Sequence, residues 1–488
     1  MNKQIIDLYP QKLWKNFYSL TQIPRPSKHE AKAVEYVKKF GKNLGLETIT
    51  DSVGNVIIRK PAVQGMENKE GVVLQAHLDM VPQKNNDKVH DFTKDPIEPI
   101  VDGEWVRANK TTLGADNGIG AASILALLES DDVRHGPLEA LFTIDEETGM
   151  TGAFALKPGI LKGSILINTD SEEEGELCIG CAGGLDANIT FDYKSQKPGN
   201  GYQAYKIYVR GLKGGHSGVD IDLGRANSNI LLVRILWRAT FKFKSRLASI
   251  NGGDLRNAIP REANAVILIP EANESEFLEF FNGYVNILKN EYHAKEADME
   301  IIAEKTGLPE KIIDEETQNR LISAVYTSPN GVVRMSDEIE GLVETSSNLA
   351  IVKTDEKEIS IQCLLRSSVD SAKDDLASRL KALFELAGAR TSFAGGYPGW
   401  KPNPYSSVLK TMKDVYKNKY GQIPEVKAIH AGLECGIIGG IYPALDMISF
   451  GPTIKYPHSP DEKVNIESVG KYWDFLVDTL KNIPDASK

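Results

Sequence analysis

The chain has 488 residues, of which 41% are hydrophobic and 25% are charged, as is usual for a globular protein. Its formal net charge of −10 argues against non-specific nucleic-acid binding, which needs a basic face. No apolar run approaches the ~18 residues of a membrane span and no signal peptide is recognisable, so we expect a cytoplasmic protein without membrane partners.

Alternating helix-like and strand-like patterns fill roughly the first 180 residues. The spacing of apolar residues predicts a helix over 30–45 and a second, strongly apolar helix over 117–130. Short apolar runs, typical of strands buried on both faces, occur at 71–77, 138–144 and 163–168. This alternation favours an α/β fold with a mixed, mostly parallel sheet flanked by helices.

The pattern changes after "CAGGLD" (181–186), where half-exposed strands and long helices follow. Strands are expected at 202–212, 264–269, 348–354 and 358–368, and helices at 227–240, 275–290, 316–327 and 370–388. An amphipathic helix is expected over 405–421 and an apolar strand over 444–452. They resemble the alternating pattern of the first 180 residues.

We therefore expect one discontinuous domain, made of residues 1–184 and 397–488, with a second, α+β domain inserted over 185–396. Pairs of glycines at 183–184 and 395–396 stand at the two crossings. They suggest hinges, because glycine absorbs large backbone changes.

Histidines and carboxylates follow the predicted strands. Strand 71–77 ends in His77, with Asp79 two residues later, and strand 138–144 runs into Asp145, Glu146 and Glu147. The carboxyl ends of neighbouring parallel strands meet at one edge of a sheet, where ligands bind. Three adjacent carboxylates at such an edge are tolerable if a cation neutralises them.

Three further candidates are Asp116 before helix 117–130, Asp170 after strand 163–168, and His458 in a loop after the last strand. Each has an ordinary explanation when taken alone, such as a helix N-cap for Asp116. Together, two histidines and several carboxylates exceed the needs of one divalent ion. They suit two ions that share a bridging carboxylate and a water, which favours amide hydrolysis. Such donors suit Zn²⁺, with Mn²⁺ or Co²⁺ as alternatives.

Six motifs in chain order resemble the co-catalytic zinc peptidases of the carnosinase, aminoacylase and glutamate-carboxypeptidase group, and most closely its dipeptidases. They cover most of the chain and are "HLDMV" (77–81), "LGADNGIG" (113–120), "DEETGMTGA" (145–153), "NTDSEE" (168–173), "GGHSG" (214–218) and "YPHSPDE" (456–462). The resemblance implies a catalytic metal-binding domain with an inserted lid.

By this resemblance, His77 and Asp170 hold one metal ion, Glu147 and His458 hold the other, and Asp116 bridges the two.

Two neighbouring carboxylates also have catalytic roles by the same resemblance. Asp79 orients the His77 imidazole through its other ring nitrogen. Glu146 is the general base, which takes a proton from the attacking water and returns it to the leaving amine.

The lid is expected to contribute three residues. His216 resembles the histidine that stabilises the oxyanion of the tetrahedral intermediate. Asn257 and Arg366 are expected to contact substrate, since an Arg fork suits a free α-carboxylate. The alternative for Arg366 is a surface ion pair at a strand end, and whether His216 acts in its own subunit or across a dimer stays open.

The sequence thus predicts a two-metal dipeptidase for unblocked dipeptides, with broad side-chain choice that includes Xaa-His. One alternative is an N-acyl amino-acid deacylase or aminopeptidase with the same metal site. Another is a binding protein on the same scaffold, which would have no need of a general base. The resemblance also implies a homodimer through the lid.

Overall fold

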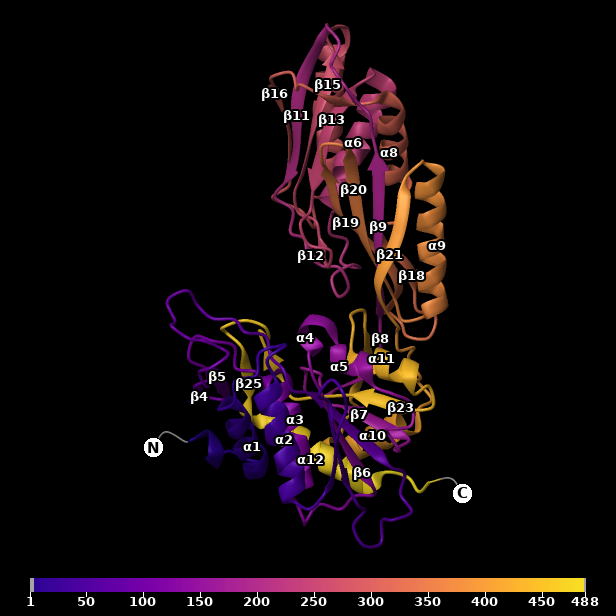
Figure 1. Ribbon diagram of the computed structural model, residues 1–488. Coiled ribbons are helices and arrows are strands. Elements are labelled where there is room, and N and C mark those ends of the chain that lie inside the picture. Colours follow the sequence, from indigo (N-terminus) through magenta and orange to yellow (C-terminus); the bar gives the residue numbers. More distant parts are fainter. Residues whose placement is uncertain (1–3, 487–488) are drawn as a thin grey trace. The chain divides into compact units, whose positions relative to one another are not determined.

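The computed structural model of the chain describes residues 4–486 (Figure 1). Its internal contacts divide it into two compact units. The first comprises Met1–Gly180, Trp400–Ala428 and Leu433–Lys488, and the second comprises Cys181–Gly399 and Ile429–Gly432. The short segment Ile429–Gly432 was not predicted to belong to the second unit, since its neighbours on both sides belong to the first.

An eight-stranded sheet forms the centre of the first unit. Its spatial order is β1 (Glu47–Thr50), β2 (Val56–Lys60), β6 (Leu138–Thr143), β3 (Val72–His77), β7 (Ile165–Asn168), β23 (Asp446–Ser449), β8 (Glu176–Cys181) and β22 (Glu425–Ile429). Strand β3 pairs in parallel with β6 and β7, and β7 pairs in parallel with β23. The pairs β1–β2, β2–β6 and β23–β8 are antiparallel. The predicted mixed sheet is therefore confirmed, with its parallel pairs at the centre.

Helix α3 (Ala115–Leu128) is the most deeply packed helix of this unit, since every residue except Asp116 is buried. A small sheet in the order β24 (Ile454–Lys455), β25 (Lys463–Asn465), β5 (Trp105–Ala108) and β4 (Pro99–Asp102) was not predicted. The helices are α1 (Gln11–Thr21), α2 (Ala31–Asn43), α3 (Ala115–Leu128), α4 (Glu146–Gly149), α5 (Thr151–Ala155), α10 (Ser407–Tyr420), α11 (Glu434–Ile441) and α12 (Ile466–Asn482), with a 3₁₀ turn at Ile5–Asp7.

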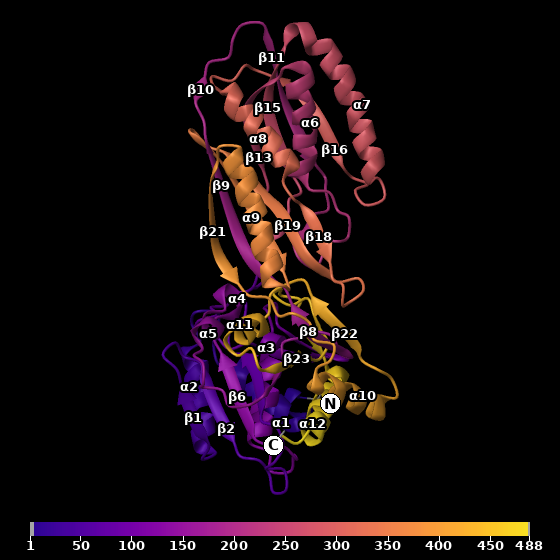
Figure 2. The same ribbon diagram turned by 90° about the vertical axis from the view of Figure 1, so that its right-hand side faces the viewer.

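The second unit is a nine-stranded sheet with long helices (Figure 2). Its order is β16 (Glu300–Thr306), β11 (Tyr202–Arg210), β15 (Ala263–Pro270), β13 (Arg246–Gly252), β19 (Val343–Thr354), β20 (Glu358–Ser367), β9 (Gly183–Asp192) and β21 (Arg390–Tyr397), with β18 (Gly331–Met335) on β19. Two short pairs are β10 (Ser195–Gln196) with β17 (Ile312–Ile313) and β12 (Gly215–His216) with β14 (Ala258–Ile259). The helices are α6 (Ser228–Phe243), α7 (Glu274–Tyr292), α8 (Glu315–Thr327) and α9 (Asp370–Leu386), with a 3₁₀ turn at Glu271–Asn273.

One face of this second sheet enters a single core with the helices. In β9, for example, Ala187, Ile189 and Phe191 are buried in the core while Asn188 and Thr190 between them are partly exposed. Such alternation is the period-2 pattern of a strand with one buried face. Among the described residues, no helix is both long and apolar enough to cross a membrane.

The glycine pairs that are expected to act as hinges lie within strands, and their role as hinges stays a prediction. Gly183 and Gly184 lie inside β9 and pair with β20, and Gly395 and Gly396 lie inside β21. A Cβ atom on Gly183 would stand 2.5 Å from the carbonyl oxygen of Tyr397. At Gly183, glycine allows close backbone approach.

Candidate metal centre

Three parallel neighbouring strands deliver ligand side chains to one edge of the first unit's sheet. His77 ends β3, Glu147 lies in the short helix α4 just after β6, and Asp170 follows β7 by two residues. Because β3 lies between β6 and β7, the carboxyl ends of these strands meet. The strand ends thus bring three of the predicted ligands together.

Asp116 stands between two pairs of side chains. Its Oδ1 lies 3.1 Å from Nε2 of His77, and that nitrogen lies 3.4 Å from Oδ1 of Asp170. Its Oδ2 lies 3.0 Å from Nε2 of His458, which is also 3.0 Å from Oε2 of Glu147. Each oxygen of Asp116 therefore faces one histidine and one carboxylate, as a bridging ligand requires.

The local backbone explains how Asp116 reaches this position. Although it falls within α3, its ψ of 114° is not helical, and Asn117 after it also departs from the helix. The carboxylate of Asp116 faces His77 and His458, so the alternative explanation of Asp116 as a helix N-cap does not account for its contacts. The kink turns the carboxylate away from the helix axis and toward the two histidines.

Asp79 is buried behind His77 and has no exposure of its own. Its Oδ1 lies 3.3 Å from Nδ1 of His77, the ring nitrogen opposite the one that faces Asp116. It also accepts hydrogen bonds from the backbone N–H of Glu146 at 3.0 Å and of Glu147 at 3.2 Å. One carboxylate thus fixes the imidazole and the adjacent glutamates.

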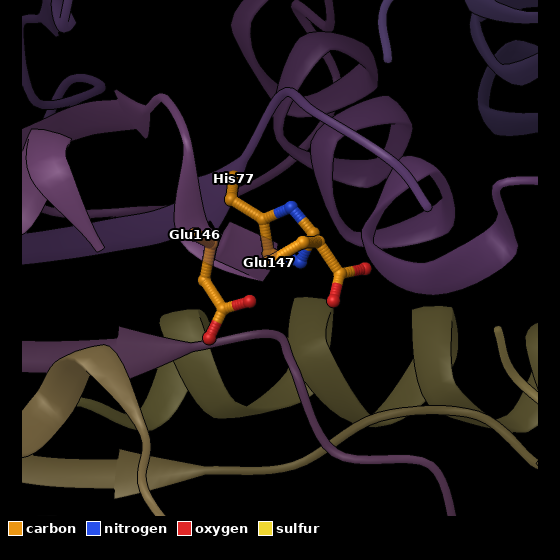
Figure 3. Close-up of side chains that lie close together, drawn as sticks. All are labelled: His77, Glu146 and Glu147. Carbon is orange, nitrogen blue, oxygen red and sulfur yellow. The ribbon is translucent and has the colours of Figure 1, made fainter. Parts of the chain in front are cut away.

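Glu146 and Glu147 both lie beside His77, and both come after the end of strand β6 (Figure 3). Within the helical turn α4 the two side chains need not point to opposite faces, as they would in a strand. Glu147 contacts His458, whereas Glu146 has no hydrogen bond to a ligand side chain in the described chain. Burial raises the pKa of the Glu146 carboxyl well above its usual range, and the charges of Asp170 and Glu147 add to this.

Asp145, the third carboxylate of the run, braces the turn. It is buried with a left-handed φ of 53°, and its carboxylate accepts hydrogen bonds from the hydroxyls of Thr148 and Thr151. Its backbone N–H donates to Glu30 at 3.1 Å. These contacts hold the chain reversal that turns Glu146 and Glu147 toward the site.

The electrostatics of the cluster fit a pair of cations. Burial opposes ionisation of Asp116, yet the two histidines that donate to it keep its pKa well below the usual range. Hydrogen bonds to Asp116 and Glu147 raise the pKa of His458 to about 11, and burial raises the pKa of Asp170 to about 7. Protons on the histidines thus balance the carboxylates here, and divalent ions would replace those protons, because a ligand imidazole must be neutral.

A buried oxygen atom without a hydrogen-bond partner also supports the binding of cations at this cluster. Oε1 of Glu147 is buried and has no hydrogen-bond partner among the described residues. Buried polar atoms are almost always paired, so this carboxylate oxygen has a place for a cation. His77, Asp116 and Asp170 form one compatible set, and Asp116, Glu147 and His458 form a second.

The lid residues lie in the second unit, where the structure brings them into a cluster of their own. Nδ1 of His216 accepts hydrogen bonds from the backbone N–H groups of Gly218 and Val219, both at 3.2 Å. Burial, and then the charge of Arg366, lower the pKa of His216, so the ring is neutral at pH 7. Its proton therefore sits on Nε2, which is left as a donor.

Arg366 is 5% exposed, so it is not the surface ion pair of the alternative interpretation. Its guanidinium donates to Ser217 Oγ at 3.4 Å and to Tyr397 Oη at 3.2 Å. Asn257 is exposed, and its carbonyl accepts a hydrogen bond from the N–H of Ser217 at 2.8 Å. Both predicted substrate residues thus meet at Ser217, next to His216.

Sequence reasoning missed several buried polar residues. In "AIHAGLECG" (428–436), His430 joins the lid cluster through a 2.7 Å contact with Ser346, and Glu434 accepts hydrogen bonds from Gln75 and Thr143 below the metal centre. A histidine at the end of strand β22 was the available signal. Arg25 and Glu462, which contact the loops beside the ligands, gave no such signal because they act on backbone atoms.

Comparison with known proteins finds relatives that match nearly the whole chain. The model of peptidase family M20/M25/M40 matches residues 73–482. The chain is 48% identical over 481 residues to the cytosol non-specific dipeptidase of Escherichia coli strain K12, covering 99% of each sequence. It is 49% identical to the solved aminoacylhistidine dipeptidase of Vibrio alginolyticus, with a TM-score of 0.95 over 99% of each chain.

A more distant solved structure shares the fold. The aminopeptidase PepT of Bacillus cereus is 16% identical, with a TM-score of 0.58 over 98% of this chain and 99% of that one. At that identity the likeness concerns the fold alone.

Proposed function

This chain belongs to peptidase family M20/M25/M40, and we propose that it is a metal-dependent dipeptidase that hydrolyses the peptide bond of unblocked dipeptides, Xaa-His among them. The observation that carries the proposal is the position of Asp116, whose two oxygens each face a histidine and a carboxylate. A relative that is named as a dipeptidase also supports the proposal, because it is 48% identical to this chain over 99% of each sequence.

We assign His77 and Asp170 to one divalent ion, Glu147 and His458 to the other, and Asp116 to both. When bound, two such ions polarise the scissile carbonyl and acidify the attacking water. Zn²⁺ is the ion that we propose, because mixed imidazole and carboxylate ligation suits it, with Mn²⁺ and Co²⁺ as alternatives.

Glu146 is the proposed general base. It lies beside the proposed ligands without an assigned ion of its own, and burial raises the pKa of its carboxyl in the metal-free chain. It takes a proton from the attacking water and delivers it to the nitrogen of the leaving amino acid. A protein that only bound dipeptides would not need this group.

The lid cluster is proposed to recognise the rest of the substrate. The Nε2–H of His216 is a neutral donor suited to the oxyanion that develops on the scissile carbonyl. The Arg366 guanidinium suits the free α-carboxylate, and the Asn257 side chain is exposed and available to substrate. Cytoplasmic location and a homodimer through the second unit remain proposals, the former supported by the name of the Escherichia coli relative.

The test combines metal analysis with a substrate panel. Purified full-length chain is stripped with a chelator and reloaded with Zn²⁺, Mn²⁺ or Co²⁺, and bound metal is counted by elemental analysis. Ala-His, Gly-Leu, Gly-Gly-Leu and N-acetyl-leucine are then compared. N-acetyl-leucine is Gly-Leu with its ammonium group replaced by hydrogen, so the pair isolates the requirement for a free N-terminus.

We expect two ions per chain and metal-dependent turnover of both dipeptides, with little turnover of the tripeptide or the acetylated compound. Turnover of N-acetyl-leucine alone would make the chain a deacylase. Cleavage of all free peptides regardless of length would make it an aminopeptidase. Dipeptide turnover that never responds to metal would end the two-metal proposal.

A further inference from the structure

Glu462 is a buried carboxylate whose two oxygens are both occupied by backbone N–H groups. It is 2% exposed. Oε2 accepts from Leu113 at 2.7 Å and Gly114 at 3.0 Å, and Oε1 accepts from Ala115 at 2.7 Å and Asp116 at 3.3 Å. Four consecutive amides thus converge on one side chain, and the last of them belongs to the bridging aspartate.

These amides need an acceptor because the chain is irregular here. The start of α3 is not helical at Asp116 and Asn117, and Gly114 before it has a left-handed φ of 69°. The first N–H groups of a helix have no partner within the helix. Glu462 supplies the missing acceptor, and Arg25 holds the same segment from its carbonyl side by donating to Gly114 O at 2.6 Å.

Glu462 is also tied to the second histidine of the site. It lies four residues after His458, and its own N–H donates to Ser459 O at 3.0 Å. Ser459 Oγ in turn donates to Tyr456 O at 3.0 Å, and the N–H of Asp461 donates to Ser459 Oγ at 3.1 Å. The segment 456–462 is therefore a bonded turn in which the place of His458 depends on that of Glu462.

From these contacts we propose that Glu462 is a positioning residue of the metal centre, an inference that rests on the proposed two-metal function. A single carboxylate joins the segment that carries Asp116 to the turn that carries His458. The two side chains meet at 3.0 Å although 342 positions separate them in sequence. Glu462 would fix the separation of these two ligands, acting through the backbone and never touching the ion.

The informative substitution is Glu462→Gln, which keeps the size of the side chain but turns an –NH₂ group toward two N–H donors. Loss of a group that orients metal ligands typically costs about 10- to 100-fold in metal affinity. We expect a loss of that size in Zn²⁺ affinity, with the ion held by Glu147 and His458 lost first.

Glu139→Gln is the matched control. Glu139 is also a buried carboxylate on a backbone amide, accepting from Lys162 N–H at 3.0 and 2.9 Å. It lies near the amino end of β6, whereas the ligands follow the carboxyl ends of the strands. This substitution should lower the melting temperature of the metal-free protein and leave Zn²⁺ affinity unchanged.

The experiment measures Zn²⁺ affinity by competition with a chromophoric chelator, Zn²⁺ stoichiometry, and the melting temperature of the metal-free chain. An affinity loss in Glu462→Gln beyond that of Glu139→Gln supports the proposal. Equal melting losses with wild-type affinity in both would make Glu462 an ordinary structural residue and overturn it.

If Glu462→Gln does not fold, Glu462→Asp decides, since the shorter carboxylate cannot reach all four amides. Weaker Zn²⁺ binding in that variant supports the proposal, and wild-type binding overturns it. Failure of the proposed function is a separate result, since the unmodified chain would then bind fewer than two ions or leave dipeptides intact.

Discussion

The carboxylate of Asp79 accepts a hydrogen bond from the backbone N–H of Glu146 at 3.0 Å, so the residue proposed to orient the His77 imidazole also holds the backbone of the proposed base. The same Oδ1 atom lies 3.3 Å from Nδ1 of His77. In a neutral ligand imidazole, a proton on Nδ1 directs the lone pair of Nε2 toward the metal. In the proposed mechanism, Asp79 would therefore couple the geometry of the ion to the geometry of proton transfer.

We expect Asp79→Asn to reduce both functions at once, because an amide can accept from only one of its terminal atoms. Zn²⁺ affinity and kcat should each fall by roughly 10- to 100-fold, with a smaller change in KM. Chelator competition and steady-state kinetics on Gly-Leu measure the two effects. Ser27→Ala removes only the 2.8 Å hydrogen bond from Ser27 to Asp79 and should change little. A loss as large in Ser27→Ala would show that packing near Asp79 matters more than its charge.

Substitutions of the adjacent residues Glu146 and Glu147 should differ in their effects on metal binding and on kcat. Glu146→Gln is expected to keep two bound ions and to lose about 10²- to 10⁴-fold in kcat, the usual contribution of a general base. Glu147→Gln should lose an ion, because Glu147 belongs to the set with Asp116 and His458. Elemental analysis beside kinetics distinguishes the two. Equal metal loss in both variants would mean that the roles within this pair are assigned wrongly.

The sequence was most informative where strands end. Residues that follow buried strands, such as His77 and Asp170, could be placed together because neighbouring parallel strands share an edge. The resemblance then supplied the roles of Asp116 and His458. No local pattern could do so, since Asp116 depends on a kink inside an apolar helix and His458 on a turn 342 positions away.

Contacts between side chains and backbone atoms could not be predicted from the sequence. Glu462 and Arg25 bind amides and carbonyls, and any sequence presents those atoms in every residue. Nor could the sequence show that Gly183 permits close strand approach, because such a glycine looks the same in sequence as one that bends. The segment 429–432 likewise belongs to the second unit through tertiary contacts alone.

Arg366 offers a test of substrate recognition in the second unit. Its guanidinium is held by Ser217 and Tyr397, which pre-orients the fork for a carboxylate. Arg366→Lys keeps the charge but removes the fork, so kcat/KM for Gly-Leu should fall by about 10- to 100-fold, the scale of a charged hydrogen bond. Gly-Leu amide lacks the carboxylate and serves as the matched substrate. An equal loss on the amide would show that Arg366 does not contact that group.

The titration of Glu434 should make the stability of the metal-free chain depend on pH. This carboxylate is fully buried on α11 and accepts hydrogen bonds from Gln75 and Thr143, both at 2.6 Å. Burial raises its pKa from 4.5 to about 7. Because the folded-state pKa lies above the unfolded one, the protonated side chain favours the folded state. Its contribution is complete below pH 4.5 and is lost as the pH rises toward 7.

The loss across that window should amount to roughly 3 kcal/mol, at about 1.4 kcal/mol per unit of pKa shift. In Glu434→Gln the amide oxygen can still accept both hydrogen bonds, but nothing titrates there. The free energy of unfolding in urea, measured for metal-free protein in chelator at several pH values from 4.5 to 8, gives the comparison. Relative to that of Glu434→Gln, the free energy of unfolding of the unmodified chain should be highest at pH 4.5. This advantage should disappear or change sign by pH 8. A difference between the two proteins that stays constant with pH would mean that folding does not raise the pKa of Glu434.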